Sequence, residues 1–205
     1  MSARASISSE VKQRILANGM GRIYFVSDFY DLGSDDVVRK TLFRLEKQGV
    51  LIRLAKGIYL YPKVDEEIGI LRPPVEEIAK EIARRDNSKL LPTGALALNV
   101  LGLSTQVPMN AVYATTGSPR QIKIGKRKII LKKAAPRYFD LKAKISSLLV
   151  FALQDIGEKN ITPEIFQQLK KVLQKSNELD LLREDLRYFP WWIRKYIISI
   201  LNTIQ

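Results

Sequence analysis

The chain has 205 residues, with 34 Lys or Arg and 21 Asp or Glu, a formal net charge of +13 and a pI near 9.9. It contains neither His nor Cys, which argues against imidazole or thiolate catalysis, disulfides and most zinc sites. No phosphate-binding loop or dinucleotide-binding glycine motif is present, so we expect a protein that is not an enzyme and binds no metal or cofactor. The positive charge favours a polyanionic partner: DNA, RNA or an acidic protein surface.

Length and hydropathy predict where the protein acts. A chain of this length holds two small domains. It has no apolar run near the ~18 residues that a membrane span needs. Its first residues lack the apolar core of a signal peptide. We therefore expect a cytoplasmic protein with no membrane partner.

The N-terminal part of the chain, 1–62, predicts a winged helix-turn-helix. A helix over residues 9–17 and a strand over residues 23–26 precede a short helix that Ser27 is expected to cap. Ser34 begins the next helix, which ends at Gly49. Two short β runs then flank Lys56-Gly57, which is a hairpin signal, and we expect the earlier strand to pair with them. A helix, a turn, a helix and a basic hairpin are a common means of binding duplex DNA.

The helix that follows Ser34 has two different faces. At about 100° per residue, Val38, Leu42 and Leu45 share one narrow face that we expect to be buried. The opposite face is rich in cations, which suit phosphates and guanine edges. An ordinary solvated surface is the alternative, but the order of elements favours DNA binding. The predicted DNA-binding residues on this helix and the hairpin are Arg39, Lys40, Phe43, Arg44, Lys47, Arg53 and Lys56.

The rest of the chain predicts an α+β protein with further parts. Residues 63–74 are expected to be a linker that ends in a rigid Pro-Pro pair. Residues 75–160 predict a mixed α+β domain, and residues 161–205 a helical C-terminal extension. The last helix, over residues 191–204, has the clearest amphipathic pattern. We expect it to pack on its own domain; docking to a partner protein or to a membrane surface is the alternative.

A second basic region lies outside the winged helix. Residues 91–140 hold eight basic residues and one acidic residue, a net +7, against a net +4 in residues 1–62. The region centres on a hairpin predicted over residues 120–133 with its turn at Gly125-Lys126. Its cations are Arg120, Lys123, Lys126, Arg127, Lys128, Lys132 and Lys133.

Two interpretations of this basic hairpin are open. Lysines on an exposed strand discourage aggregation between sheet edges. Alternatively, the hairpin binds a nucleic acid or an acidic protein surface. Because it belongs to a different predicted domain from the cationic helix and carries mostly Lys, we expect it to serve the C-terminal function or an accessory phosphate contact rather than base recognition.

Over residues 21–145 the chain resembles the AbiEi-like antitoxin family of bacterial toxin–antitoxin and abortive-infection systems. The matching segments are IYFVSDF at residues 23–29, LEKQGVLIRLAKGIYLYP at 45–62, PTGALALNVLGLSTQVP at 92–108 and YATTGSPR at 113–120. The tail from about residue 162 lies outside the resemblance.

The resemblance implies a DNA-binding autorepressor that is also an antitoxin. Its winged helix would bind double-stranded DNA in its own promoter, at inverted repeats, through the seven residues named above. Its C-terminal part would counteract a nucleotidyltransferase-type toxin encoded by a neighbouring gene. Two alternatives are a solitary transcriptional regulator and an interaction module that binds RNA or an acidic protein through the basic hairpin.

Overall fold

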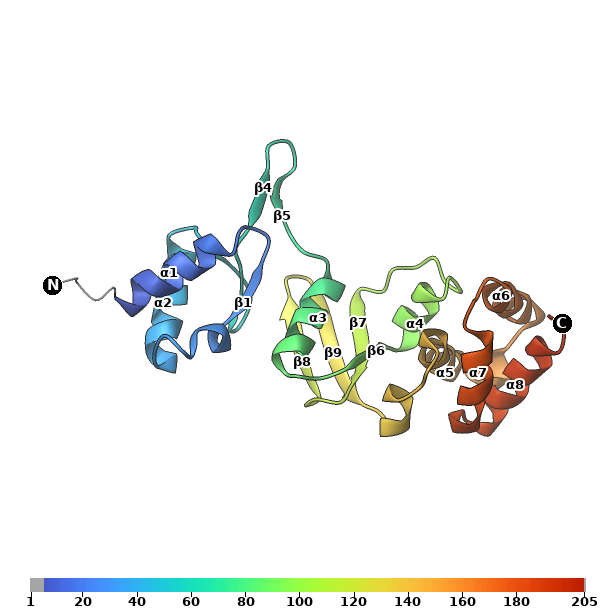
Figure 1. Cartoon of the computed structure of the whole chain (residues 1–205). Coiled ribbons are helices and arrows are strands. Elements are labelled where there is room, and N and C mark those ends of the chain that lie inside the picture. Colours follow the sequence, from blue (N-terminus) through green and yellow to red (C-terminus); the bar gives the residue numbers. More distant parts are fainter. Residues whose placement is uncertain (1–5, 205) are drawn as a thin grey trace. The chain divides into compact units, whose positions relative to one another are not determined.

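The structure is a computed structural model that describes residues 6–204. These residues form an α+β fold of helices and three small sheets (Figure 1). Two compact units make up the chain. The first contains the residues up to Asp86 together with Ile122–Arg127, and the second contains Asn87–Gln121 together with the residues from Lys128 onward.

The first unit has the predicted order of helix, strand, short helix, helix and hairpin. Strand β3 lies between β1 and β2 and pairs antiparallel with both. The predicted pairing of the earlier strand with the hairpin is thereby confirmed. The elements are α1 (Ile7–Ala17), β1 (Ile23–Phe25), the 3-10 helix η1 (Val26–Phe29), α2 (Asp35–Lys47), β2 (Ile52–Ala55) and β3 (Ile58–Leu60).

The apolar periodicity of the sequence determines the core of this unit. Val38 and Leu42 are fully buried and Leu45 nearly so, which confirms the predicted inner face of α2. Burying each such side chain stabilises the unit by about 1.5–3 kcal/mol. The other buried members of the cluster are Val11, Ile15, Tyr24, Val26, Phe29, Leu51 and Tyr59.

The contacts at the two helix starts differ from expectation. Ser27 lies within η1, not before it, and its Oγ makes no hydrogen bond within the described residues. The Asp28 carboxylate caps η1 instead, by accepting from the Phe25 N–H at 2.8 Å. Ser34 precedes α2 as predicted, but it is extended and its side chain makes no capping hydrogen bond.

The predicted linker contains a second hairpin. Strands β4 (Lys63–Asp65) and β5 (Gly69–Leu71) pair antiparallel (Figure 1). The Asp65 carboxylate closes their turn by accepting from the N–H groups of Glu67 and Ile68 at 2.9 and 3.0 Å. Helix α3 (Val75–Arg85) follows, with Ile78 and Ile82 among its buried residues. The first unit therefore continues past the predicted boundary at residue 62, to Asp86.

A four-stranded sheet contains the basic hairpin. Its strand order is β6-β7-β9-β8, with β7 antiparallel to β6 and parallel to β9. Strand β8 is thus an edge strand and β9 an interior strand. The turn between them lies at Gly125-Lys126, as predicted. The strands are β6 (Leu90–Pro92), β7 (Asn110–Thr115), β8 (Arg120–Ile124) and β9 (Arg127–Lys133).

The helices of the second unit share one core. Ile193, Ile197 and Ile200 of α8 are fully buried in the same cluster as Leu149 and Leu153 of α5. Own-domain packing of α8 is confirmed, and the predicted separation at residue 161 is not observed. The helical elements are α4 (Gly94–Val100), η2 (Pro136–Phe139), α5 (Lys144–Ile156), η3 (Glu158–Asn160), α6 (Pro163–Gln174), α7 (Leu179–Asp185), η4 (Leu186–Tyr188) and α8 (Trp191–Leu201).

A buried carboxylate on α7 caps α5. Asp185 is 1% exposed, and its two oxygens accept from the N–H groups of Lys142 and Ala143 at 3.0 and 2.9 Å. Glu178 also accepts from the Ile145 N–H at 3.2 Å. Negative charge at a helix N-terminus satisfies free donors and interacts favourably with the helix dipole. These bonds join segments that are far apart in the sequence.

Candidate nucleic-acid interface

Helix α2 presents a cationic face to solvent. With Val38, Leu42 and Leu45 buried, the side chains of Lys40, Phe43, Arg44 and Lys47 are exposed. Two acidic residues in the first turn and Arg44 and Lys47 near the end both suit the helix dipole. Phe43 is 49% exposed, and the Lys47 Nζ lies 5.3 Å from its ring centroid. The face therefore combines charge with one apolar contact surface.

The cations of this face differ in how they are paired. Arg39 Nε lies 2.6 Å from an Asp35 carboxylate oxygen, in an i, i+4 ion pair that is about half exposed. Within residues 6–204, Lys40 and Arg44 make no ion pair. Lys40 and Arg44 are therefore better placed than Arg39 to contact an anionic ligand.

The hairpin of β2 and β3 carries Arg53 and Lys56, both exposed as expected. The Arg53 Nε donates to the Ala55 carbonyl at 3.4 Å, within the same strand. The pairing of β2 with β3 shifts register between Arg53 and Ala55, and such a bulge increases the local twist. Gly57 has φ +73°, the left-handed conformation that glycine adopts without strain. All seven predicted contact residues thus lie in the first unit with exposed side chains.

Three residues near these cations were not predicted from the sequence. A hollow of about 490 Å³ is lined by Ser27, Tyr30 and Arg85 as well as by Arg39 and Lys56. Tyr30 is 58% exposed. The Arg85 guanidinium lies 4.5 Å from the Phe25 ring centroid and donates to Asp86 at 2.9 Å. Arg85 comes from α3, so no local pattern indicates that it lies near the β2–β3 hairpin. Tyr30 could be noticed in the sequence only as an aromatic residue between two predicted helices.

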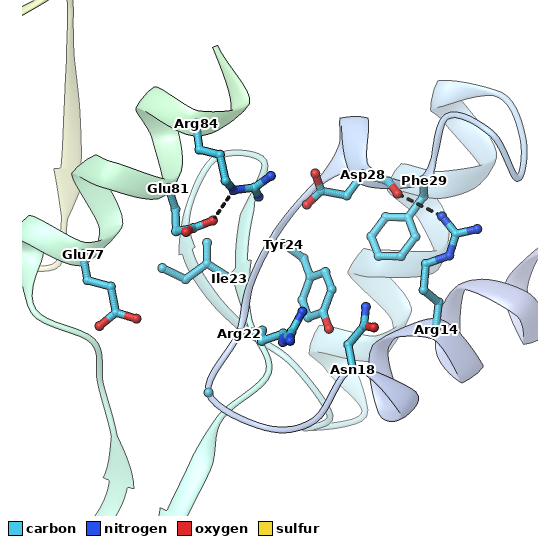
Figure 2. A pocket seen from close by; sticks show the side chains of 11 residues that line it. Arg14, Asn18, Arg22, Ile23, Tyr24, Asp28, Phe29, Glu77, Glu81 and Arg84 are labelled. Carbon is cyan, nitrogen blue, oxygen red and sulfur yellow. Dashed lines mark hydrogen bonds and ion pairs between the residues drawn. The ribbon is translucent and has the colours of Figure 1, made fainter. Parts of the chain in front are cut away.

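A second hollow is lined by equal numbers of cationic and acidic residues, some of which pair with each other. It holds about 370 Å³ and is lined by Arg14, Arg22 and Arg84 and by as many carboxylates: Asp28, Glu77 and Glu81 (Figure 2). Arg14 donates to the Asp28 carbonyl at 3.2 Å, and Arg84 pairs with Glu81 at 2.8 Å, as the dashed lines show. Equal numbers of opposite charges make this hollow a poor site for a polyanion.

Arg14 also ties α1 to the turn between η1 and α2. Its two terminal nitrogens bind both carboxylate oxygens of Asp31 at 2.8 and 2.6 Å. The hydrogen bonds from Arg14 lower the pKa of Asp31 below its ordinary value. The stabilisation is therefore present above the unfolded pKa and is lost as the pH falls through the lowered pKa. Because the pair is at the surface, its contribution is small.

The second basic patch is divided between the two units. Six of its cations are exposed, and Arg120 is partly buried. Lys126 and Arg127, at the hairpin tip, belong to the first unit, whereas Lys128, Lys132 and Lys133 belong to the second. The expectation that the whole hairpin belongs to a different domain from α2 is therefore corrected. Lys123 lies on the edge strand β8, where a lysine can discourage pairing with another sheet. The lysines of β9 lie on an interior strand, where that explanation does not apply.

Nothing in residues 6–204 groups three or more carboxylates at a site that could hold a metal ion. The same residues include no helix long and apolar enough to cross a membrane.

The fold and its similarity to known proteins identify the family of the chain. It is an α+β protein that carries exposed cations on α2 and on the β2–β3 and β8–β9 hairpins. The chain belongs to a family of unknown function, DUF6088, whose model matches residues 10–181. A solved structure, the RV2827C protein from Mycobacterium tuberculosis, is similar over 98% of this chain and 78% of that chain, with a TM-score of 0.50 and 14% identity, which indicates a shared fold alone. No curated protein matches.

Proposed function

We propose that this protein is a transcriptional autorepressor whose first unit is a winged helix-turn-helix that binds duplex DNA. The strongest support is the exposed face of α2, where Lys40 and Arg44 are unpaired within the described residues and stand beside Phe43. The order of elements and the β1-β3-β2 strand order agree with what a winged helix requires, which supports the proposal. The proposal assigns no catalytic activity to the chain.

The dimensions of α2 suit the major groove. An α-helix with its side chains is about 10–12 Å across, which matches the width of the groove, about 12 Å. The 13 residues of α2 give it a length of ~20 Å along the groove. In the proposed complex Lys40 and Arg44 contact guanine edges or phosphates, and Phe43 contacts a thymine methyl group. Lys47 and Arg39 bind phosphates at the rim of the groove. Arg53 and Lys56 on the wing reach the adjacent backbone, which positions the protein without reading sequence.

A reporter assay tests the proposed repression. The region upstream of the gene is fused to a reporter and the protein is supplied from a second plasmid. Repression that disappears when the inverted repeats of this region are scrambled supports the proposal. Equal expression with and without the protein would exclude autorepression.

The turn of the wing allows a specific test of its role. Gly57 has φ +73°, and a Cβ built on it meets nothing within 4 Å, so the cost of substitution is backbone strain rather than a clash. Gly57→Val should distort the wing and lower DNA affinity several-fold while the second unit stays folded. Gly57→Asn is the matched control, because Asn tolerates this conformation. Affinity measured by fluorescence anisotropy should order the proteins as wild type, Asn variant, Val variant; equal affinities would show that the wing is not used.

We further propose that the second unit is an antitoxin that binds a nucleotidyltransferase-type toxin. The proposal rests on the resemblance of residues 21–145 to AbiEi-like proteins. A surface feature adds support: Trp191 is 73% exposed, with the Lys195 Nζ 5.6 Å from its ring centroid. Exposed Trp residues are frequent energetic centres of protein interfaces. Co-expression with the product of a neighbouring nucleotidyltransferase gene, scored as growth, tests this role.

Trp191→Ala should weaken protection against that toxin and leave DNA binding unchanged. Truncating a central interface Trp costs about 2–4 kcal/mol of binding energy, which a growth assay at graded expression detects. Met109→Ala is the control, since Met109 is a similarly exposed apolar residue of the second unit, at 69%. If the Trp191 variant protects cells fully, Trp191 is not part of the toxin interface.

A further inference from the structure

The tip of the β8–β9 hairpin and the wing line one hollow in the first unit. This hollow has a volume of about 580 Å³. Four of its lining residues are cations and none is acidic: Arg53, Arg72, Lys126 and Arg127. Apolar residues, among them Leu54 and Ile124, also line it. A concave cationic surface of this kind is suited to an extended anionic chain.

The fold does not compensate these four charges. All four side chains are exposed, and none makes an ion pair within residues 6–204. Like charges gathered around one hollow repel each other and lower the stability of the unit. A counter-charge from outside the described chain relieves that repulsion, so the arrangement points to an anionic ligand.

Protection of a strand edge does not explain the charges of Lys126 and Arg127. Edge protection needs cations along the exposed side of an edge strand, as for Lys123 on β8. Lys126 lies in the turn and Arg127 begins the interior strand β9. Their charges therefore protect no strand edge.

We infer that the hairpin tip acts as a second wing, so that the hollow between it and the first wing holds the phosphodiester backbone of duplex DNA. This rests on the proposed function, because Arg53 belongs to the wing that the DNA-binding proposal places on the backbone. Arg53 and Arg72 contact the phosphates from one side and Lys126 and Arg127 from the other. Such contacts raise affinity for every sequence and carry no base preference.

The test compares the full-length protein with Lys126→Gln/Arg127→Gln. Affinity is measured for the native upstream duplex and for a scrambled duplex of equal length at several salt concentrations. The control, Lys159→Gln/Lys171→Gln, removes the same charge from exposed residues of the second unit. Circular dichroism confirms that each variant is folded.

The expected result is a roughly tenfold or greater loss of affinity for both duplexes in the hairpin variant. The slope of log K against log salt should become shallower by about two, at ~0.9 per lost phosphate contact. The preference for native over scrambled DNA should stay unchanged, and the control variant should match wild type.

The outcomes distinguish this inference from the proposed function. Wild-type affinity and salt slope in the hairpin variant, while changes on α2 abolish native-DNA binding, would overturn the second wing and leave the proposed function intact. If the hairpin variant binds DNA like wild type but no longer protects against a toxin, the hairpin tip contacts a protein partner. That result would also overturn the second wing. No preference of the wild-type protein for native DNA would instead count against the proposed function.

Discussion

Replacing Lys40 and Arg44 together by alanine should abolish selective binding to the native upstream DNA. Both side chains are exposed on α2 and make no ion pair within the described residues, so the variants lose ligand contacts without losing structural ones. A contact with a guanine edge contributes about 1–3 kcal/mol, or up to about a hundredfold in affinity, and its loss relaxes specificity at one base pair. A phosphate contact lowers affinity for all sequences when it is lost and flattens the salt dependence.

The single variants separate these two roles. Each is titrated against a set of duplexes that differ from the native site at one base pair, and against a scrambled duplex. The control is Lys12→Ala/Lys80→Ala, which removes two exposed cations from α1 and α3. Native-site binding by the Lys40/Arg44 double variant at wild-type strength would show that α2 is not the helix that enters the groove.

Asp185→Ala should destabilise the second unit strongly. Asp185 is 1% exposed and accepts from the N–H groups of Lys142 and Ala143. Its removal leaves two donors near the start of α5 without partners, at about 1–3 kcal/mol for each. A total of about 2–6 kcal/mol lowers the Tm of a unit of this size by roughly 10 °C or more.

The adjacent Glu184 supplies the control for that measurement. Glu184 pairs with Lys142 at the surface, where both side chains are about half exposed, and such pairs contribute about 0–1 kcal/mol. Glu184→Ala should therefore change Tm little in the same differential scanning calorimetry. Equal Tm values for the Asp185 and Glu184 variants would mean that the buried capping bonds contribute little.

Local patterns predicted the first unit well. The inner face of α2 follows from the spacing of Val38, Leu42 and Leu45, and helix periodicity alone decides which side chains remain outside. The hairpin turn follows from Lys56-Gly57, because few residues other than glycine adopt a positive φ without strain. Each of these features depends on residues close together in the sequence.

Short strands and distant contacts were not predictable in the same way. Strands β4 and β5 have three residues each, too few for a periodicity to be distinguished from a loop. Their turn depends on hydrogen bonds from two backbone N–H groups to the Asp65 carboxylate. A single Asp in a polar segment does not reveal such hydrogen bonds. The segment therefore resembles a linker in sequence.

The boundaries between units depend on contacts across long sequence distances. Arg85 stacks on Phe25, which lies far from it in the sequence, and this contact ties the end of α3 to the first unit. Asp185 caps α5 from a similarly distant position, and the isoleucines of α8 share the core of α5. No composition change or breaker residue marks such contacts, so sequence patterns placed boundaries at residues 62 and 161 where the structure has none.

The central claim, that the first unit binds its own upstream DNA selectively, is tested most directly by titrating that duplex with the full-length protein at two salt concentrations. An electrophoretic shift or fluorescence anisotropy gives the affinity, and a scrambled duplex of the same length is measured in parallel. We expect tighter binding to the native duplex at both salt concentrations, with affinity for both duplexes falling steeply as salt rises. Equal affinity for the native and scrambled duplexes at both concentrations would contradict the claim.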